Sequence, residues 1–132
     1  MSTVANLLVQ IKNAQAVGAA EVSVPFSKTI WAIAEVLKAK GFIANLEKKK
    51  KKLRRAEADW LELRLQYADG VGAINGIKLV SKSSRRIYAG KNELFPVRNG
   101  YGMAVLSTPR GIMTGEAARR AGVGGEILFE IW

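Results

Sequence analysis

The amino-acid sequence predicts an α+β protein made of two small lobes. Apolar residues recur at helical spacing in two segments near the N-terminus and one near the C-terminus, whereas period-two alternation marks most segments between and after them. The turn sequence Asp69-Gly70-Val71-Gly72 then divides the 132 residues into an N-terminal α/β lobe, residues 1–68, and a mostly β C-terminal lobe, residues 69–132. Because 48% of the residues are hydrophobic, the chain can fill a substantial core.

Two helices and a strand are expected at the start of the N-terminal lobe. The first helix covers residues 3–15, where apolar side chains recur at helical spacing. Residues 21–25 alternate between polar and apolar and stop at a proline, which predicts a short strand. The second helix begins after Ser27, a good N-cap, and ends near Gly41, which suits the left-handed residue that follows many helices.

A β-hairpin is expected to complete this lobe. Residues 42–46 form one strand and residues 60–67 the other, with apolar side chains on one face and polar ones on the opposite face. The basic run between them is interpreted as a mobile loop that becomes ordered on nucleic-acid phosphate, or that simply stays solvated. Its candidate auxiliary phosphate contacts are Lys48, Lys49, Lys50, Lys51, Lys52, Arg54 and Arg55.

The C-terminal lobe is expected to be mostly β with one short helix. Short strands are predicted around residues 77–80, 86–88 and 102–106. A turn at Gly111 leads to Thr114, a plausible N-cap for a helix over residues 116–121 that Gly122 closes. Alternation over residues 126–132 predicts a final strand.

The composition excludes most catalytic templates. Cysteine and histidine are both absent, which removes disulfides, thiolate metal sites, cysteine nucleophiles and imidazole bases. No cofactor, metal or small-molecule substrate is expected, and the chain is not expected to be an enzyme. No apolar run approaches the roughly 18 residues that span a bilayer, and the N-terminus lacks the pattern of a signal peptide. The protein is therefore expected to be cytoplasmic, with no membrane partner.

The charge points to an anionic partner. The formal net charge is +10, and the basic run alone supplies seven of the 21 cations. A second excess of cations lies between residues 71 and 110. A chain of this charge without catalytic residues is typical of a nucleic-acid-binding protein.

The most informative segment is the corner formed by residues 107–114. Two hydroxyls, a guanidinium and a glycine lie together after a strand, where they can exchange hydrogen bonds in several directions. In one interpretation, Ser107 and Thr108 donate to structured RNA, Arg110 binds phosphate, and Gly111 lets the backbone approach closely. In the other, the segment is an ordinary turn whose hydroxyls satisfy local amides.

Further candidates in the same lobe each have a functional and a structural interpretation. Tyr88 either stacks on a base or packs against its own lobe. Arg85 and Arg86 either bind phosphate or make no specific contact. Glu126 either accepts hydrogen bonds from exocyclic amines of bases or orients Arg110. Candidate backbone contacts in the first lobe, which solvent alone would equally explain, are Lys28, Lys12 and Asn13.

Residues 102–114, which include Ser107-Thr108-Pro109-Arg110-Gly111, together with residues 117–119 and 122–126, resemble the bacterial form of the small-subunit ribosomal protein S-eight family. Weaker matches occur in the same order over residues 11–14, 24–28, 36–43 and 86–88, so the resemblance covers nearly the whole chain. It implies two lobes and no enzymatic activity. It also implies direct binding to an irregular stem in the central domain of small-subunit ribosomal RNA, assembly of the platform, and neighbouring small-subunit ribosomal proteins as partners.

The resemblance makes RNA contact the favoured interpretation of the corner, and places the chain on a cytoplasmic ribosome, although an organellar ribosome is also compatible. Two departures from the family pattern stand out. Pro109-Arg110 replaces the usual serine-lysine, which adds a planar fork for phosphate and removes one backbone N–H. The lysine run is not a usual family feature, so the alternative is a generic basic nucleic-acid-binding protein driven by that segment.

Overall fold

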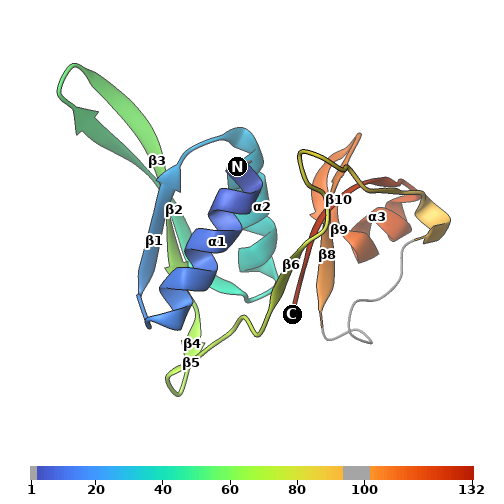
Figure 1. The fold of residues 1–132 in the computed structure, drawn as a ribbon, viewed down its shortest axis with the longest axis horizontal. Helices are drawn as coiled ribbons and strands as arrows, with labels where there is room; N and C mark the ends of the chain where they lie inside the picture. The colour runs from blue at the N-terminus through green and yellow to red at the C-terminus, as the bar shows by residue number, and fades with distance from the viewer. Residues whose placement is uncertain (1–2, 94–101) are drawn as a thin grey trace. The chain divides into compact units, whose positions relative to one another are not determined.

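A computed structural model describes residues 3–93 and 102–132 of the chain (Figure 1). The chain separates into two compact units: residues 6–73 form one, and residues 74–132 are grouped with the N-terminal residues up to Ala5 in the other. Helices and antiparallel sheets in separate segments, with a mostly β C-terminal unit, confirm the predicted α+β class. The division into domains at residues 68 and 69 stays a prediction. None of the helices in the described ranges is long and apolar enough to cross a membrane.

The first unit is a three-stranded antiparallel sheet with two helices on one side (Figure 1). Its elements are α1 (Thr3–Ala16), β1 (Glu21–Pro25), α2 (Lys28–Ala39), β2 (Ile43–Leu53) and β3 (Ala56–Leu65), and the strand order is β1-β3-β2. The apolar face of β3 meets the apolar stripes of the helices because every second residue of a strand shares a face. Fully buried side chains in this core include Leu7, Ile11, Ile33, Leu37, Leu61 and Leu63.

Local chemistry fixes both ends of α2 as predicted. The Ser27 hydroxyl accepts a hydrogen bond from the Ile30 N–H at 3.1 Å, which satisfies one of the amide groups left unpaired at a helix N-terminus. At the other end Gly41 has φ +81°, and its amide donates to the Lys38 carbonyl. A residue with a Cβ atom would be strained in this left-handed conformation.

The prediction of a mobile basic loop is wrong. Strand β2 continues through the lysine run, and residues 48–52 pair in register with residues 57–61 of β3. Only Arg54 and Arg55 form the turn between the two strands. The strand forms because β3 provides an unbroken antiparallel partner for the run, and because acidic and aromatic side chains on and beside β3 lie within reach of several of the lysines.

A short hairpin and a break in β3 were also not anticipated. Tyr67 does not continue β3; it begins β4 (Tyr67–Ala68), which pairs with β5 (Val71–Gly72) around the turn at Asp69 and Gly70. The Tyr67 hydroxyl donates to the Ala19 carbonyl at 2.6 Å, so the side chain is used to anchor the hairpin. This hairpin belongs to the first unit.

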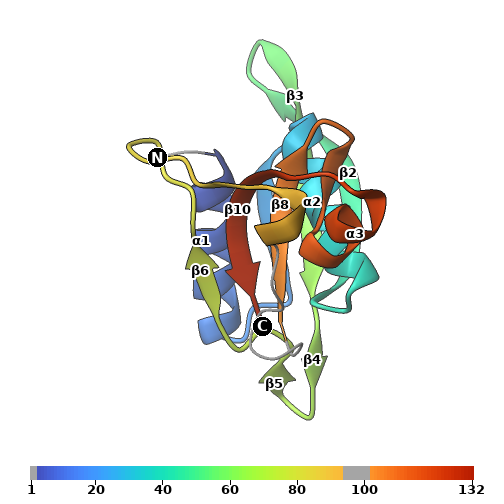
Figure 2. The same ribbon diagram turned by 90° about the vertical axis from the view of Figure 1, so that its right-hand side faces the viewer.

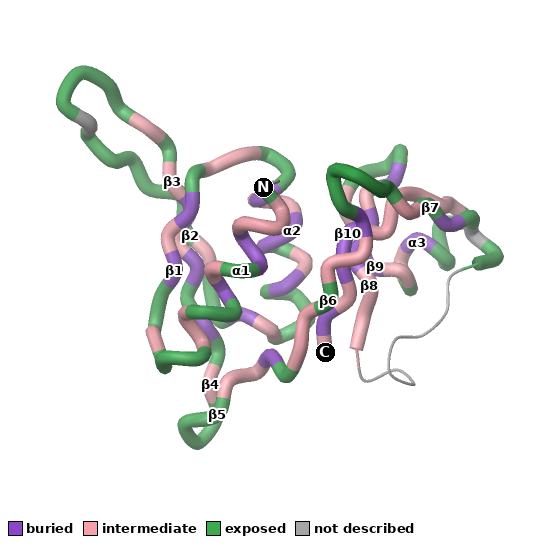
Figure 3. Tube along the Cα trace, viewed as in Figure 1, coloured by how far each residue is buried: buried purple, intermediate pink, exposed green. Residues whose placement is uncertain are grey.

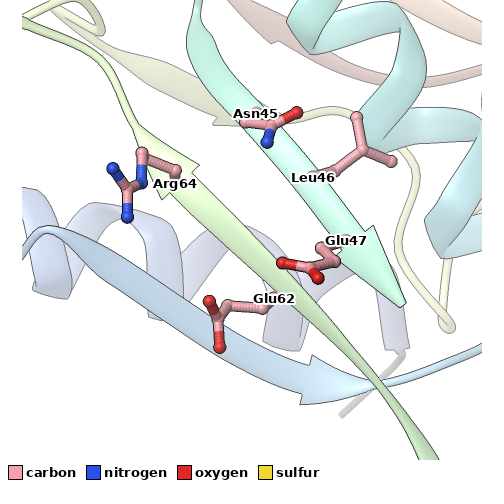
Figure 4. A pocket seen from close by; sticks show the side chains of 5 residues that line it. All are labelled: Asn45, Leu46, Glu47, Glu62 and Arg64. Atoms are coloured by element: carbon pink, nitrogen blue, oxygen red, sulfur yellow. The ribbon is translucent and has the colours of Figure 1, made fainter. Parts of the chain in front are cut away.

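The polar face of the three-stranded sheet balances its own charges. Lys49 Nζ lies 3.0 Å from a Glu62 carboxylate oxygen, and an Arg64 guanidinium nitrogen lies 3.0 Å from a Glu21 carboxylate oxygen. Beside them is a small open pocket of about 120 Å³ lined by Asn45, Leu46, Glu47, Glu62 and Arg64 (Figure 4). The hydrogen bond from Lys49 lowers the pKa of Glu62, and the same bond raises the pKa of Lys49.

The second unit is an antiparallel sheet with a helix on one face. Its elements are β6 (Ile77–Leu79), β7 (Tyr88–Ala89), a 3₁₀ turn (Lys91–Glu93), β8 (Met103–Thr108), β9 (Gly111–Thr114), α3 (Gly115–Ala121) and β10 (Gly125–Ile131). Strand β10 is central: β8 pairs along one edge, whereas β6 and β7 pair with successive parts of the other edge (Figure 2). Strand β9 was not predicted. Helix α3 is capped by Thr114 and Gly122, as expected.

Removal of the α2 cap should destabilise the protein. We expect Ser27→Ala to lower the free energy of unfolding by about 0.5–2 kcal/mol, because the Ile30 amide loses its acceptor. Ser27→Asn is the matched control, since asparagine can still accept this bond. Urea unfolding followed by far-UV circular dichroism measures both variants, and equal stability of the two would contradict the assigned cap.

The Lys49–Glu62 pair predicts a pH dependence. Because the pKa of Glu62 is lowered in the folded state, the pair contributes stability above the ordinary Glu pKa of 4.5, and this is lost as the pH falls through the lower folded value. We expect Glu62→Gln to be slightly less stable than the parent at pH 7, with the difference vanishing in acid below pH 4.5. The effect is small because Lys49 is exposed to solvent and Glu62 is only partly buried. Thermal unfolding between pH 7 and pH 3 tests this, with Glu35→Gln as the control, because Glu35 is an exposed carboxylate that forms no ion pair with the described residues.

Candidate nucleic-acid interface

A row of three side chains crosses the second unit at one end of its sheet. Ser107 on β8 is directly opposite Glu126 on β10, and Glu126 is in turn directly opposite Tyr88 on β7. Residues that face each other in antiparallel strands share a face, with Cβ atoms roughly 4.5–5.5 Å apart. The register therefore places a hydroxyl, a carboxylate and a phenol side by side, although 37 residues separate the first candidate along the chain from the last.

An open cavity of about 530 Å³ adjoins this row. Four of the predicted site residues line it, namely Tyr88, Ser107, Thr108 and Glu126. The residues that line it are Tyr88, Ala89, Gly90, Glu93, Ser107, Thr108, Pro109, Gly124, Gly125 and Glu126. Residues from three strands and the turns between them thus surround a single concave surface, which is large enough to receive part of a ligand.

Glu126 forms an ion pair with Arg86. The Arg86 guanidinium lies 3.2 Å from one carboxylate oxygen of Glu126 and 3.4 Å from the other. The Glu126 side chain is 14% exposed, whereas that of Arg86 is 58% exposed. The partner within the described residues is Arg86, so the structural interpretation that Glu126 orients Arg110 is not supported. The guanidinium offsets the negative charge of the carboxylate while leaving its own outer edge in solvent.

Two hydroxyl groups at the cavity have no hydrogen-bond partner within residues 3–93 and 102–132. Neither the Ser107 hydroxyl nor the Tyr88 phenol makes a hydrogen bond to the described part of the chain. Tyr88 is 68% exposed, which rules out the interpretation that its ring packs against its own lobe. Both groups are therefore free to donate to, and accept from, a ligand.

Thr108 behaves differently from its neighbour. Its hydroxyl donates to the Gly111 carbonyl at 2.8 Å and accepts from the Arg110 amide at 3.1 Å, and the residue is buried. It therefore closes the β8–β9 turn from inside, which is the structural interpretation of the corner. Gly111 supplies the φ of +115° that this turn requires, and the Arg110 side chain is left exposed. Direct contact of Thr108 with a ligand stays a prediction.

Sequence reasoning did not single out three residues that shape the cavity. At Gly124 and Gly125 an added Cβ atom would collide with the backbone carbonyls of Ala89 and Ser107 respectively, so the strands come this close only because both residues are glycine. The buried Ser81 hydroxyl accepts from the Ile87 amide at 3.0 Å and donates to the Ile127 carbonyl at 2.6 Å, which fixes the segment that carries Arg86. The two consecutive glycines could have indicated a close approach of backbones from the sequence alone, whereas no sequence signal distinguished Ser81.

The remaining candidate residues are exposed, but they do not belong to this row. Arg85 follows a tight turn in which the amides of Lys82 and Arg85 donate to each other's carbonyls at 2.9 and 3.0 Å. Lys28, Lys12 and Asn13 lie in the first unit, on α2 and α1. Lys28 is the first residue of α2, where a cation opposes the helix dipole, so local helix stability does not explain it.

The chemistry of the row is that of recognition. Within residues 3–93 and 102–132, no group of three or more acidic side chains is arranged to hold a metal ion. The carboxylate of the row is paired with a guanidinium, and no nucleophile with an adjacent base accompanies it. What the row offers is hydrogen-bond donors, an acceptor and an aromatic ring on one concave surface.

Comparison with known proteins identifies the family. The sequence profile described as Ribosomal protein S8 matches residues 2–132. Small ribosomal subunit protein uS8 of Xanthomonas euvesicatoria pv. vesicatoria (strain 85-10) is 48% identical over 125 residues, covering 95% of this chain and 92% of the relative. The protein of the same name from Nitratidesulfovibrio vulgaris (strain DP4) is 41% identical over 129 residues, covering 98% and 96%. That of Stenotrophomonas maltophilia (strain K279a) is 46% identical over 125 residues, covering 95% and 92%.

These matches confirm the resemblance found in the sequence. The chain belongs to the ribosomal protein S8 family, and it is accordingly a structural protein of the ribosome and not an enzyme.

Proposed function

We propose that the chain is a constituent of the small ribosomal subunit that binds small-subunit ribosomal RNA directly through the Ser107–Glu126–Tyr88 row. The observation that carries this proposal is the register that brings the three side chains together at an open cavity. Relatives at 41–48% identity are named small ribosomal subunit proteins, which supports the small subunit as the place of action.

The chemistry of the row suits irregular RNA. Regular A-form helices hide their bases in a deep, narrow groove, so sequence-specific proteins read bases that are splayed out in loops, bulges and distorted stems. An exposed tyrosine can stack on such a base, a hydroxyl can bond its edge or a ribose, and a carboxylate can accept from an exocyclic amine. Three such groups on one surface match an irregular stem, which we place in the central domain of the RNA.

Cations around the row have a different role. Arg110 at the turn, Arg86 beside Glu126 and Arg85 after its tight turn are all exposed and are assigned to phosphate groups. Phosphate contacts position a protein on RNA, whereas base contacts provide discrimination. Lys12, Asn13 and Lys28 of the first unit are assigned to the RNA backbone in the same way. Glu126 is acceptable near phosphate because Arg86 offsets its charge.

Binding of this kind would hold an irregular stem in one geometry and so help to assemble the platform of the small subunit. Neighbouring ribosomal proteins are the expected protein partners. The site of action is the cytoplasmic ribosome, or an organellar one of bacterial type.

A second candidate function is generic binding of nucleic acid through charge. It is favoured by one observation, the seven cations within residues 48–55. A generic binder would be displaced equally well by unrelated duplex DNA and by small-subunit RNA, because phosphate contacts carry no sequence information. Competition between the two nucleic acids at one salt concentration separates the candidates.

Neighbouring hydroxyls should give opposite results when each is removed. We expect Ser107→Ala to weaken binding to deproteinised small-subunit RNA by about two- to tenfold while leaving unfolding unchanged within about 0.5 kcal/mol. Thr108→Ala should instead lower the free energy of unfolding by about 0.5–1.5 kcal/mol or more, because the Gly111 carbonyl and the Arg110 amide lose a partner. Filter binding and urea unfolding measure both. If the Ser107 variant still discriminates target from random RNA as well as the parent, the row is not the recognition surface.

The role of Tyr88 is separable by two substitutions. Tyr88→Ala should reduce affinity by about 1–3 kcal/mol if the ring stacks on a base, whereas Tyr88→Phe keeps the ring and should retain most of the binding. Stability should not change in either variant, since the residue is 68% exposed. Equal losses in both variants would assign the contact to the phenol hydroxyl instead of the ring.

A further inference from the structure

Residues 48–59 form a basic arm that extends beyond the sheet of the first unit (Figure 1). The last register pair between β1 and β3 joins Pro25 to Trp60, and the Phe26 amide then donates to the Asp59 carbonyl at 3.0 Å. Beyond that point β2 and β3 pair only with each other, up to the turn at residues 54 and 55. The arm is mostly exposed (Figure 3).

Lysines at the base of the arm are fixed by aromatic rings. Lys48 Nζ lies 4.3 Å from the centroid of the Phe26 ring and 3.6 Å from an Asp59 carboxylate oxygen. Lys51 Nζ lies 4.1 Å from the centroid of the Trp60 ring. An isolated two-stranded hairpin is only marginally stable in water, so these cation–π contacts help to keep the two strands together.

The seven cations of the arm therefore fall into two groups. The inner group consists of Lys48, Lys49 and Lys51, each of which has a protein partner. These partners are Asp59, Glu62 and the Trp60 ring respectively. The side chains of the outer group make no hydrogen bond, ion pair or ring contact with the described residues; this group consists of Lys50, Lys52, Arg54 and Arg55.

The outer group forms a concentrated and exposed positive charge. Lys50 and Lys52 share one face of β2, because alternate residues of a strand point the same way, and the two arginines follow at the turn. Residues 48–59 contain seven cations and two acids, so their net charge of +5 is half of the +10 of the whole chain. Lysine is depleted in strands and like charges repel, so this segment is not optimised for stability. Segments that break local rules in this way are often functional.

We propose that the basic arm is a preformed contact for the phosphate backbone of RNA, made by the four outer cations. This inference rests on the proposed function and adds to it a second contact that is independent of sequence. Arginine presents a planar fork that matches phosphate oxygens, whereas lysine acts as a point charge. Base stacking on the arm is disfavoured because the two aromatic rings beside it, Phe26 and Trp60, already carry Lys48 and Lys51 over their faces. The arm thus strengthens binding without selecting the RNA.

The salt dependence of binding tests the outer group directly. The outer variant replaces all four cations of the outer group with glutamine: Lys50→Gln, Lys52→Gln, Arg54→Gln and Arg55→Gln. It should reduce the slope of the logarithm of the RNA-binding constant against the logarithm of the salt concentration by about 3, since each phosphate contact contributes roughly 0.7–0.9. The reduction should be the same for deproteinised small-subunit RNA and for random RNA of equal length, so that the ratio of the two affinities stays that of the parent.

A matched control removes the same number of exposed cations elsewhere. The variant Lys38→Gln, Lys40→Gln, Lys78→Gln, Arg119→Gln should change the slope by less than about 1, because these residues lie outside the proposed contacts. Equal slopes for the two quadruple variants would overturn the proposal. So would a loss of discrimination between the two RNAs in the outer variant. A third outcome would also overturn the proposal: the outer variant keeps the parent's salt dependence of RNA binding but no longer sediments with small subunits. That outcome would assign the arm to an acidic protein surface.

A gain-of-function variant removes any ambiguity from folding. Glu57 is directly opposite Lys52 in the arm, so Glu57→Gln should tighten binding to both RNAs by about two- to fivefold at low salt. No gain in affinity would count against the arm. Failure of the arm and failure of the proposed function are distinguishable, because Ser107→Ala changes discrimination at constant slope whereas the outer variant changes slope at constant discrimination.

Discussion

The alignment of the Ser107–Glu126–Tyr88 row depends on how closely the start of β10 approaches its two neighbouring strands, β7 and β8. At Gly124, just before β10, and at Gly125, its first residue, the backbone lies against the carbonyls of Ala89 and Ser107 respectively, in space that any side chain would fill. Because both neighbours are held at this distance, β7 and β8 pair with the same residue, Glu126, from opposite sides. The alignment of Ser107, Glu126 and Tyr88 is thus a consequence of backbone packing.

Within this frame, adjacent residues have separate tasks. Thr108 directs its hydroxyl inward to the turn, whereas Ser107, one position earlier and on the opposite face of β8, keeps its hydroxyl free. Glu126 is similarly dependent on a neighbour, since the Arg86 guanidinium offsets the negative charge of its carboxylate. Arg86 in turn is positioned through Ser81, which bonds both the Ile87 amide and the Ile127 carbonyl. The exposed groups are therefore held by buried ones.

Features encoded locally could be predicted from the sequence, and features that depend on distant residues could not. Ser27 and Gly41 lie at the two ends of α2, and Thr114 and Gly122 lie at the two ends of α3. These ends could be predicted because each cap acts within one turn of its helix. The lysine run lies between two strand patterns and is therefore predicted as a loop from the sequence, whereas the acidic and aromatic partners that hold it in a strand lie mostly on β3.

The same limit applies to the candidate site. Each residue of the row could be named as a candidate from its chemistry, but its neighbours could not, because the Arg86–Glu126 pair spans 40 residues and the alternative of Arg110 was equally plausible from sequence. Thr108 was the converse case: its side chain chemistry suggested a ligand contact, and only the three-dimensional turn shows that the hydroxyl is already used. Inward and outward hydroxyls cannot be told apart by residue type.

In the proposed function, charge and specificity are carried by different parts of the chain. On the polar face of the first sheet, Lys49 with Glu62 and Arg64 with Glu21 offset one another, so that face adds little to the field around the protein. The uncompensated charge is concentrated at the arm, where the groups are cationic and repetitive. The Ser107–Glu126–Tyr88 row has the opposite character, with two neutral hydroxyls and one carboxylate whose charge the Arg86 guanidinium offsets. Long-range attraction needs many similar charges and tolerates loose geometry, whereas discrimination needs few groups held in register. In this proposal the arm and the row lie in separate strands, so salt weakens the attraction by the arm without disturbing the discrimination by the row.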